Sequence, residues 1–398
     1  MTTAPHASRS TRFAQRLGLP ATGLGSLAPR EVWAWVDRVR AGGLGADERA
    51  ATIVLVYRFW LVALLLKALG SGWDVAWHFR FIRDDFAPPH NLNLIGDGVA
   101  IALVLFHLYT RFGADRTALR LMAGGAAMFV LSAPVDVINH RLNGLDITSW
   151  SATHFGLYVG TGIMIAGVIR GWHTSGSGLP RHSLILGAFW FFFLENIWFP
   201  AQHQEYGVEA IAAWDRGDPY AEPSLLQFAA DQLGRAVDRE AVVGFALPVP
   251  SWVYPVWTVV AAGLTLVLAR RMIGWRWSAT ALAGAFLVWR CVLYPLLLVG
   301  GFPPSAVPFA ILALGLAIDL VCAVRLPAIA EAALGAVAVT AAMYAAMYAQ
   351  SNTLVAPPIS YPSAGAAAAL LLVGWTAVRL LTFPRTTLIP KQPSEGQY

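Results

Sequence analysis

Residues 51–110 read ATIVLVYRFWLVALLLKALGSGWDVAWHFRFIRDDFAPPHNLNLIGDGVAIALVLFHLYT, in which two apolar segments flank a polar stretch rich in Asp and His. The apolar segments run from Ala51 to Gly70 and from Asn93 to Tyr109. Each is close to the length that a helix needs to cross a hydrocarbon core of roughly 30 Å. The stretch therefore predicts two antiparallel membrane-spanning helices joined by a polar turn.

The rest of the chain continues this apolar pattern. Of 398 residues, 57% are hydrophobic and 13% are charged, against roughly a quarter charged in a soluble domain, which argues against a water-soluble globule. We expect an all-α, polytopic transmembrane helical bundle of about ten spans, the first of which is interrupted by Arg58 and Lys67. The later predicted spans cover residues 119–138, 152–169, 183–199, 250–269, 278–300, 305–326, 328–348 and 364–381.

Basic residues collect in alternate loops between these spans. Because Lys and Arg in short loops tend to remain cytoplasmic, we expect a multi-pass protein of the inner (plasma) membrane with both termini in the cytoplasm. The polar turn after Gly70 then faces the extracytoplasmic side. The basic residues that decide this orientation are Arg111, Arg116, Arg120, Arg170, Arg181, Arg270, Arg271, Arg276, Arg385 and Lys391.

This topology divides the chain into five segments. They are an N-terminal segment at 1–50, a first transmembrane half at 51–199, an acidic extracytoplasmic loop or cap at 200–249, a second half at 250–384 and a cytoplasmic tail at 385–398. The N-terminal segment lacks a secretory signal, so we expect it to remain on the mature protein, and its stretch LAPREVWAWVDRVRAG has the pattern of an amphipathic interfacial helix. The long loop is typical of a functional lid.

Charge and cysteine content add two constraints. The formal net charge of +5 indicates no nucleic-acid partner, because basic residues at cytoplasmic helix ends account for it. Cys291 and Cys322 each lie inside a predicted span, so neither a disulfide framework nor a thiolate metal cluster is indicated. The lipid bilayer is the partner that the composition requires.

The polar turn of the first hairpin recurs after the third span. The first copy is WDVAWHFRFIRDDFAPPHNLNLIG, beginning at Trp73, and the second is VDVINHRLNGLDITSWSATHFGLYVG, beginning at Val135. Only the stretch from the second Asp to the last His differs in length, by two residues, so we interpret the pair as an internal repeat in the N-terminal half. The aligned residues are Asp74 with Asp136, His78 with His140, Asp84 with Asp146, His90 with His154, and Gly96 with Gly160.

The spacing within each copy brings three potential metal ligands together. Asp74 and His78 lie four residues apart and hence on one face of a helix, and His90 opens the next, antiparallel helix. Two imidazoles and a carboxylate form the N,N,O set that zinc, copper, iron and manganese use, with positions left open for water, oxygen or substrate. We predict metal ligation by Asp74, His78 and His90 and, in the second copy, by Asp136, His140 and His154.

Further polar residues lie near the predicted ligands. Asp97 follows His90 at helical spacing and is a candidate outer partner of the first site. Glu195, at the outer end of the fifth span, and His203 just beyond it lie at the same predicted depth. The second acidic residue of each copy, Asp84 or Asp146, completes the supporting candidates.

A structural interpretation of the repeat is the alternative. An Asp can cap a helix and a His can form hydrogen bonds between helices without any metal. Ionisable residues in membrane-spanning segments are costly and tend to mark function, and the recurrence of the same three residues in the same order favours metal binding. Elsewhere we expect a buried ion pair between Arg290 and Asp319, with a proton or substrate relay as the alternative, and a hydrogen-bonded packing role for His107.

The stretch DVAWHFRFIRDDFAPPH at residues 74–90 resembles the metal-binding segment of the C subunit of particulate methane and ammonia monooxygenases. In that family an Asp and two His ligate a metal that is usually assigned as copper, so the resemblance implies Asp74, His78 and His90 as copper ligands. This chain departs from the family in its ten predicted spans, in its second motif and in being one residue shorter before the Phe. The pair of motifs is also similar to that of a family of bacterial polytopic membrane proteins, a likeness that implies no activity. The matching positions are Asp74, Trp77, His78, Arg83, Asp84, Phe86, Pro88 and His90.

Three functions stay open at the level of sequence. The leading hypothesis is a monooxygenase-like, metal-dependent membrane oxidoreductase that acts on a small or lipid-soluble substrate, with copper the favoured metal and iron or zinc as alternatives. Because no reductase domain, haem motif or flavin fingerprint is visible, it would need an electron donor or other membrane subunits. The second hypothesis is metal handling or transport, which predicts ligands at successive depths. The third is a non-catalytic subunit of a membrane complex.

Overall fold

The structure is a computed structural model that describes residues 29–82, 84, 87–143 and 148–381. In these ranges the regular elements are helices and no strand occurs, as the sequence predicts. Nine of the described helical segments are long and apolar enough to cross a membrane. The chain is therefore an all-α bundle with the character of a multi-pass membrane protein. The predicted tail at 385–398 and most of the N-terminal segment lie outside the described residues.

The first half of the chain consists of long antiparallel helices that follow one another directly. A short amphipathic helix precedes them, as the sequence predicts for the stretch after residue 28. The elements are α2 (Pro29–Arg40), α3 (Ala46–His78), α4 (Pro88–Thr110), α5 (Arg116–Asn143), α6 (Ala152–Ser175) and α7 (His182–Asp215).

The second half follows two short helices. The predicted loop at 200–249 contains the end of α7 and both of these short helices, so much of it is helical. The elements are α8 (Pro223–Gln232), α9 (Arg239–Ala246), the continuous segment α10 (Val253–Trp257), η2 (Thr258–Ala262) and α11 (Gly263–Ile273), then α12 (Ser278–Val299), α13 (Ala310–Val324), α14 (Ala328–Ser351), η3 (Tyr361–Ser363) and α15 (Ala364–Leu381).

The predicted span at 305–326 is only partly helical. Residues 302–308 have no regular structure and α13 begins at Ala310. Pro303, Pro304 and Pro308 fall in or next to this segment, and proline cannot donate a helical hydrogen bond. With 15 residues α13 is about 22 Å long, which is shorter than a hydrocarbon core. The prediction of a full-length helix here is therefore wrong at its N-terminal end.

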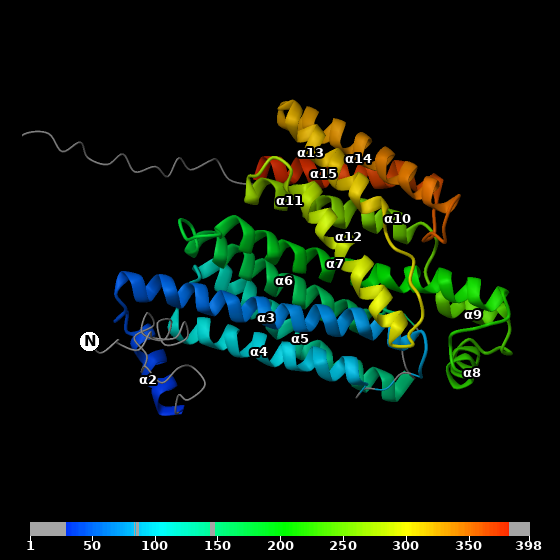
Figure 1. Cartoon of the computed structure of the whole chain (residues 1–398), viewed down its shortest axis with the longest axis horizontal. Coiled ribbons are helices and arrows are strands. Elements are labelled where there is room, and N and C mark those ends of the chain that lie inside the picture. Colours follow the sequence, from blue (N-terminus) through cyan, green and yellow to red (C-terminus); the bar gives the residue numbers. More distant parts are fainter. Residues whose placement is uncertain (1–28, 83, 85–86, 144–147, 382–398) are drawn as a thin grey trace, which may run out of the picture.

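The helices are arranged in two groups that pack along α7 (Figure 1). Helices α3 to α7 form one group and α10 to α15 form the other, with α7, α11 and α12 in mutual contact between them. Helices α8 and α9 lie at one end of the bundle, and α2 lies at the other (Figure 1). The turns that carry the two Asp/His motifs lie at the same end as α8 and α9.

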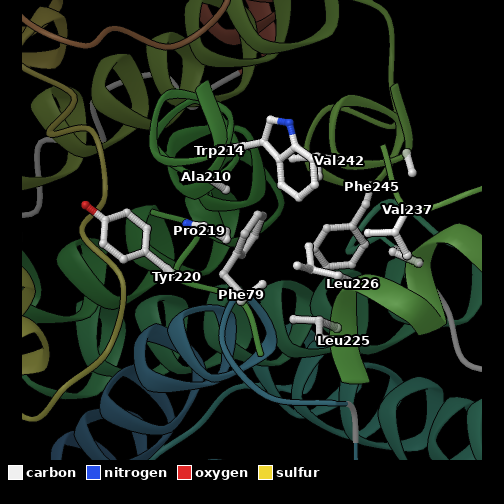
Figure 2. A pocket seen from close by; sticks show the side chains of 13 residues that line it. Phe79, Ala210, Trp214, Pro219, Tyr220, Leu225, Leu226, Val237, Val242 and Phe245 are labelled. Atoms are coloured by element: carbon white, nitrogen blue, oxygen red, sulfur yellow. The ribbon is translucent and has the colours of Figure 1, made fainter. Parts of the chain in front are cut away.

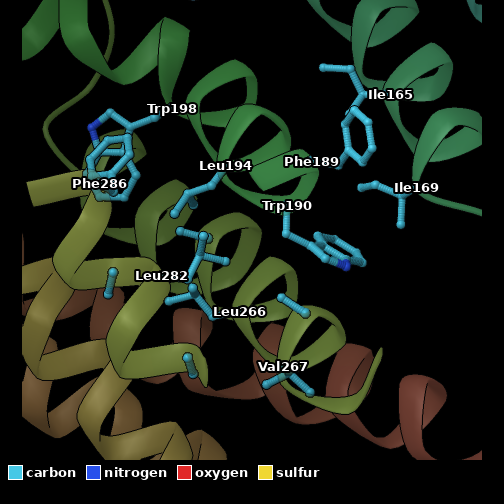
Figure 3. Close-up of a cluster of buried hydrophobic side chains, with 14 of the residues drawn as sticks. Ile165, Ile169, Phe189, Trp190, Leu194, Trp198, Leu266, Val267, Leu282 and Phe286 are labelled. Atoms are coloured by element: carbon cyan, nitrogen blue, oxygen red, sulfur yellow. The ribbon is translucent and has the colours of Figure 1, made fainter. Parts of the chain in front are cut away.

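Large apolar side chains fill the contact between the two groups (Figure 3). Leu194 and Trp198 of α7 are completely buried on the side of Leu266 of α11 and Phe286 of α12, whereas Phe189 of α7 is buried on the side of Ile165 and Ile169 of α6. Since lipid is as apolar as these side chains, close packing rather than exclusion of water holds the helices together. Helix α7 is thereby a fixed wall against which the first four long helices can be positioned.

The internal repeat is also a structural repeat of two helical hairpins, α3–α4 and α5–α6. A Cβ added at Gly96 of α4 would lie 2.9 Å from the backbone oxygen of Ala63 in α3, and one added at Gly160 of α6 would lie 2.9 Å from the backbone oxygen of Gly125 in α5. Gly96 aligns with Gly160, and Ala63 lies as far before the first motif Asp as Gly125 lies before the second. The two hairpins therefore cross at the same register, through small residues that let the backbones approach.

A half-buried charge pair lies at the opposite end of the second hairpin. Asp115 accepts a hydrogen bond from the backbone N–H of Ala118, at the start of α5, and receives three more from the guanidinium of Arg170 in α6, at 2.7–3.1 Å. The Arg170 hydrogen bonds hold the pKa of the Asp115 carboxyl below its ordinary value. The pair ties α5 to α6 at the end of the bundle remote from the motifs.

Candidate metal centre

The first Asp/His/His triad converges on a single point. Asp74 and His78 lie one turn apart at the end of α3, and His90 lies in the first turn of α4, which starts at two prolines. The Asp74 Oδ1 atom lies 3.1 Å from His78 Nε2 and 2.8 Å from His90 Nε2, and the two Nε2 atoms lie 3.2 Å apart. The predicted convergence of these three side chains is confirmed.

This triangle suits a metal ion better than a hydrogen-bonded network. Ligand atoms about 2.1 Å from one metal ion lie roughly 2.9–3.4 Å apart, close to the three distances in the triad. Each Nε2 atom carries at most one proton, so the two histidines supply at most two protons for the three contacts among Asp74 Oδ1 and the two Nε2 atoms. Hydrogen bonds alone therefore leave at least one of the three contacts without a bridging proton. A cation satisfies all three atoms at once.

The second triad has the same residues in a wider arrangement. Asp136 and His140 lie at the end of α5 and His154 in the first turn of α6. The His140 Nε2 atom lies 3.6 Å from Asp136 Oδ1, and the three ligand atoms lie within 4.8 Å of one another. Asp136 Oδ1 is buried and accepts no hydrogen bond from the described residues, which is costly for a carboxylate oxygen. A cation would remove that cost.

Ser151 holds the ring of His154. Its Oγ atom caps α6 by accepting the backbone N–H of His154 at 3.3 Å, and it lies 2.8 Å from His154 Nδ1. Histidines that ligate metals through Nε2 commonly donate the Nδ1 proton to such an outer partner, which fixes the tautomer and the ring orientation. One hydroxyl therefore both starts the helix and orients a candidate ligand.

The cap formed by α8, α9 and the end of α7 anchors the first triad from outside. Phe79, directly after His78, is buried against Phe245 and the other apolar side chains of the cap (Figure 2). The pocket that they line has only about 20 Å³ of free space, so it is a packed core rather than a ligand site. The backbone N–H of Glu222 also bonds to the carbonyl of Arg80 at 2.9 Å. These contacts fix the outer end of α3.

Both triads line one cavity of about 380 Å³. Nine positions line the cavity in both hairpins, counted from the alignment of the motifs. Five pairs come from α3 and α5 and four from α4 and α6. They are Lys67/Phe129, Ser71/Ala133, Asp74/Asp136, Val75/Val137, His78/His140, His90/His154, Asn93/Leu157, Leu94/Tyr158 and Asp97/Thr161.

The supporting residues predicted from sequence lie along the same cavity but have different partners. Asp84, Asp97, Glu195 and His203 all line it. Asp97 is buried and forms an ion pair with Lys67 of α3. The His203 Nε2 atom lies 3.0 Å from the carbonyl oxygen of Phe245 in the cap. Asp146 lies outside the described residues.

Glu195 has a partner that the sequence did not predict. Its Oε2 atom accepts a hydrogen bond of 2.8 Å from Arg290 Nη2 of α12, and both side chains are buried. Asp319 pairs instead with Arg270 of α11, at 2.7 Å. The predicted pair between Arg290 and Asp319 is therefore wrong. Because α13 starts late, Asp319 lies beside Thr280 at the first turn of α12, whereas Arg290 lies about 18 Å along that helix.

A buried carboxylate in α7 was missed by the sequence analysis. Glu205 is completely buried and accepts hydrogen bonds from Trp198 Nε1 at 2.6 Å and from the hydroxyls of Tyr254 and Tyr294, both at 2.9 Å. The sequence places Glu205 in a loop, and its two tyrosine partners come from α10 and α12. The one available signal in the sequence was the spacing of seven residues, or two helical turns, between Trp198 and Glu205.

His107 has the packing role that the sequence predicts. Its Nε2 accepts a hydrogen bond from Trp60 Nε1 at 3.1 Å, and its Nδ1 lies 2.8 Å from the carbonyl oxygen of Phe112. Both ring nitrogens are thus engaged by groups of α3 and of the turn after α4, far from the motifs. A metal-binding role for His107 is not needed to explain its burial.

Searches against protein-family models, curated proteins and solved structures found no match to this chain. The resemblance of residues 74–90 to the monooxygenase C subunit accordingly remains a prediction. The two triads and their shared cavity carry the functional argument.

Proposed function

We propose that this chain is an integral membrane metalloprotein, a metal-dependent oxidoreductase that acts on a small or lipid-soluble substrate. The observation that supports it is the pair of Asp/His/His triads on one cavity of about 380 Å³. Three ligands leave further coordination positions open, and the open side of each triad adjoins space in which a substrate can lie. A purely structural staple needs no such space.

The ligand chemistry limits the metal. The lining of the cavity, among the described residues, contains imidazole and carboxylate groups and neither Met nor Cys, so soft ligands for Cu(I) are not part of it. Copper(II) is the divalent ion that an N,N,O site holds most tightly in the Irving–Williams order, and the resemblance at residues 74–90 points the same way. Iron and zinc fit the same ligands.

The residues of the chain divide the work at the first triad. Asp74 supplies negative charge that offsets part of the charge of a divalent ion, and His78 and His90 supply neutral nitrogen ligands. A bound copper or iron ion would supply redox chemistry at the positions that these ligands leave open. Oxidation of a substrate requires an external electron donor, which we expect among the protein's partners together with the bilayer and other membrane subunits.

The position of the triads favours this function over metal transport. A transport path requires ligands at successive depths, whereas both triads lie where α3 and α5 end and where α4 and α6 begin. From the basic residues of the opposite loops we place this end of the bundle at the extracytoplasmic face of the plasma membrane, with both termini in the cytoplasm.

Elemental analysis of detergent-purified protein tests the proposal. We expect wild type to bind stoichiometric copper, iron or zinc. The double variant His78→Ala with His90→Ala should lose the metal bound by the first triad, and His140→Ala with His154→Ala should lose the metal bound by the second. His173→Ala is the matched control, because His173 is an exposed histidine near the opposite end of α6. Folded wild type that binds no metal after reconstitution would refute the proposal and leave a structural or docking role.

A further inference from the structure

The two hairpins face each other across the cavity as near equivalents. Lys67 of α3 lies over the ring of Phe129 of α5, with Nζ 4.5 Å from the ring centroid, and these two residues occupy equivalent positions of the repeat. Contact between equivalent residues indicates an approximate two-fold axis between the hairpins. Such an axis creates two equivalent gaps at the sides of the cavity, one between α3 and α6 and one between α4 and α5.

Helix α7 covers only one of these gaps. Phe192, Glu195 and Phe199 of α7 line the cavity beside α3 and α6, and there Val75 is 5% exposed and Tyr158 is 6% exposed. The wall on this side is closed.

The equivalent residues at the other gap are uncovered. Val137, the counterpart of Val75, is 36% exposed, and Leu94, the counterpart of Tyr158, is 67% exposed. Both still line the cavity. The gap between α4 and α5 is therefore a side opening into the cavity.

This opening lies at a depth where lipid surrounds the protein. Leu94 follows the start of α4 by six residues, and Val137 precedes the end of α5 by six residues, which places both about 9 Å inside the helix ends. Ile95, Leu131 and Ile138 next to them are apolar and exposed. Such a surface on spanning helices faces acyl chains rather than water.

Beyond the triads the cavity continues inward past polar side chains, among them Ser71 and Thr161, to apolar side chains at its inner end. Its lining reaches Leu64 in α3, Phe129 in α5 and Ile165 in α6. From Asp74 to Leu64 the helix rises about 15 Å, roughly the length of an alkyl chain of ten to twelve carbons. The charged groups of this inner part are paired, Lys67 with Asp97 and Glu195 with Arg290 of α12, so they leave no net charge to bind an ionised ligand.

We propose that the substrate is an uncharged, single-chain amphiphile of the medium-chain alcohol class, which reaches the cavity from the bilayer between α4 and α5. Its chain lies against Leu64, Phe129 and Ile165, and its polar end lies at the triads. The assignment of this molecule as substrate rests on the proposed function; its binding does not.

Photolabelling in liposomes tests the binding. The probe is dodecan-1-ol with a diazirine near its methyl end, and mass spectrometry maps the labelled peptides. We expect labelling at the inner cavity, on the peptides that carry Phe129 and Ile165, and competition by excess unlabelled dodecan-1-ol. Val137→Trp fills the opening and should lower this labelling at least fivefold. Leu131→Trp, an exposed position of the same helix that does not line the cavity, is the matched control.

Two results would overturn the inference. Labelling confined to the outer surface of α5 shows that the chain does not enter, and equal inner labelling of Val137→Trp and Leu131→Trp shows that it does not pass between α4 and α5. Metal content measured on the wild-type sample separates this inference from the proposed function. If the inner cavity is labelled but the protein holds no metal, binding of the amphiphile stands and the metalloenzyme proposal fails. If the protein holds metal but the inner cavity is not labelled, the metalloenzyme proposal stands and this inference fails.

Discussion

The hydroxyl of Ser151 gives the sharpest test of the second triad. If His154 ligates a metal through Nε2, its Nδ1 proton points at Ser151 Oγ, 2.8 Å away. Loss of such an outer partner typically lowers metal affinity about 10-fold to 100-fold, or about 1.4–2.7 kcal/mol. We therefore expect Ser151→Gly and Ser151→Ala to weaken metal binding by that factor at this triad.

The same hydroxyl caps α6, so the two roles have to be separated. Replacement of a capping Ser by Ala costs about 0.5–2 kcal/mol of stability, whereas replacement by Gly costs only a few tenths. Ser151→Gly thus removes the hydrogen bond to His154 with little loss of helix stability. Ser151→Asp keeps a cap and an acceptor for the Nδ1 proton, and we expect it to bind metal at least as tightly as wild type.

A copper(II) titration against a competing chelator measures the effect. The background is His78→Ala with His90→Ala, so that only the second triad reports, and unfolding in mixed micelles is recorded for each variant. Equal affinities of Ser151, Ser151→Gly and Ser151→Asp within about twofold, below the 10-fold minimum expected for a lost outer partner, would refute ligation by Nε2 of His154.

Three further predictions concern the scaffold. Gly96→Ala should lower the free energy of unfolding by about 1–3 kcal/mol, because the added Cβ would lie 2.9 Å from the α3 backbone. Gly98→Ala, whose added Cβ has no neighbour within 4 Å, should raise the free energy of unfolding by about 0.5–1 kcal/mol. Similar free energies for the two variants, measured by unfolding in mixed micelles, would contradict the hairpin register. Arg290→Met should lower the free energy of unfolding by about 3–5 kcal/mol, because it leaves the Glu195 charge buried and unpaired. Adding Glu195→Gln should recover much of this loss in the same assay. A double variant no more stable than Arg290→Met would contradict this prediction. Hydrogen bonds from Arg170 lower the pKa of Asp115, so the contribution of this pair to stability is present above the ordinary pKa of the carboxyl and is lost as pH falls through the lowered value. Asp115→Asn should lower the melting temperature slightly at pH 7, because a half-buried pair near the surface is worth less than about 1 kcal/mol. The difference in melting temperature from wild type should shrink toward pH 3.

The sequence was sufficient for the triads because their geometry is local. An Asp and a His four residues apart share a helix face whatever the rest of the fold does, and a short turn brings His90 back beside Asp74. The repeat in turn predicted a second triad of the same kind. Convergence of both triads on one cavity depends on how two hairpins pack, and no spacing along the chain fixes that.

The buried charges illustrate what spacing could not supply. Arg290 was assigned to Asp319 by counting residues from predicted helix ends, and the late start of α13 after its prolines moved Asp319 toward the opposite end of α12. The apolar pattern of the fifth predicted span ends at residue 199 and so predicts a loop at Glu205, whereas α7 continues to Asp215. The contacts that decide these cases join Arg290 to Glu195 and Glu205 to Tyr254 and Tyr294, at sequence separations of 49 to 95 residues, where sequence pattern carries no information about distance.

The elements added to the duplicated hairpins account for the unequal character of the two gaps and the two triads. Two hairpins that face each other can turn their costly polar residues toward a shared cavity and away from lipid. A single additional helix, α7, can cover only one of the two equivalent gaps, and the second half of the chain packs on α7 rather than on α4 or α5. The cap covers the outer end of α3, next to the first triad. Among the described residues, the gap between α4 and α5 is consequently the side on which no further element covers the cavity, and it is there that we propose a lipid-soluble molecule to enter.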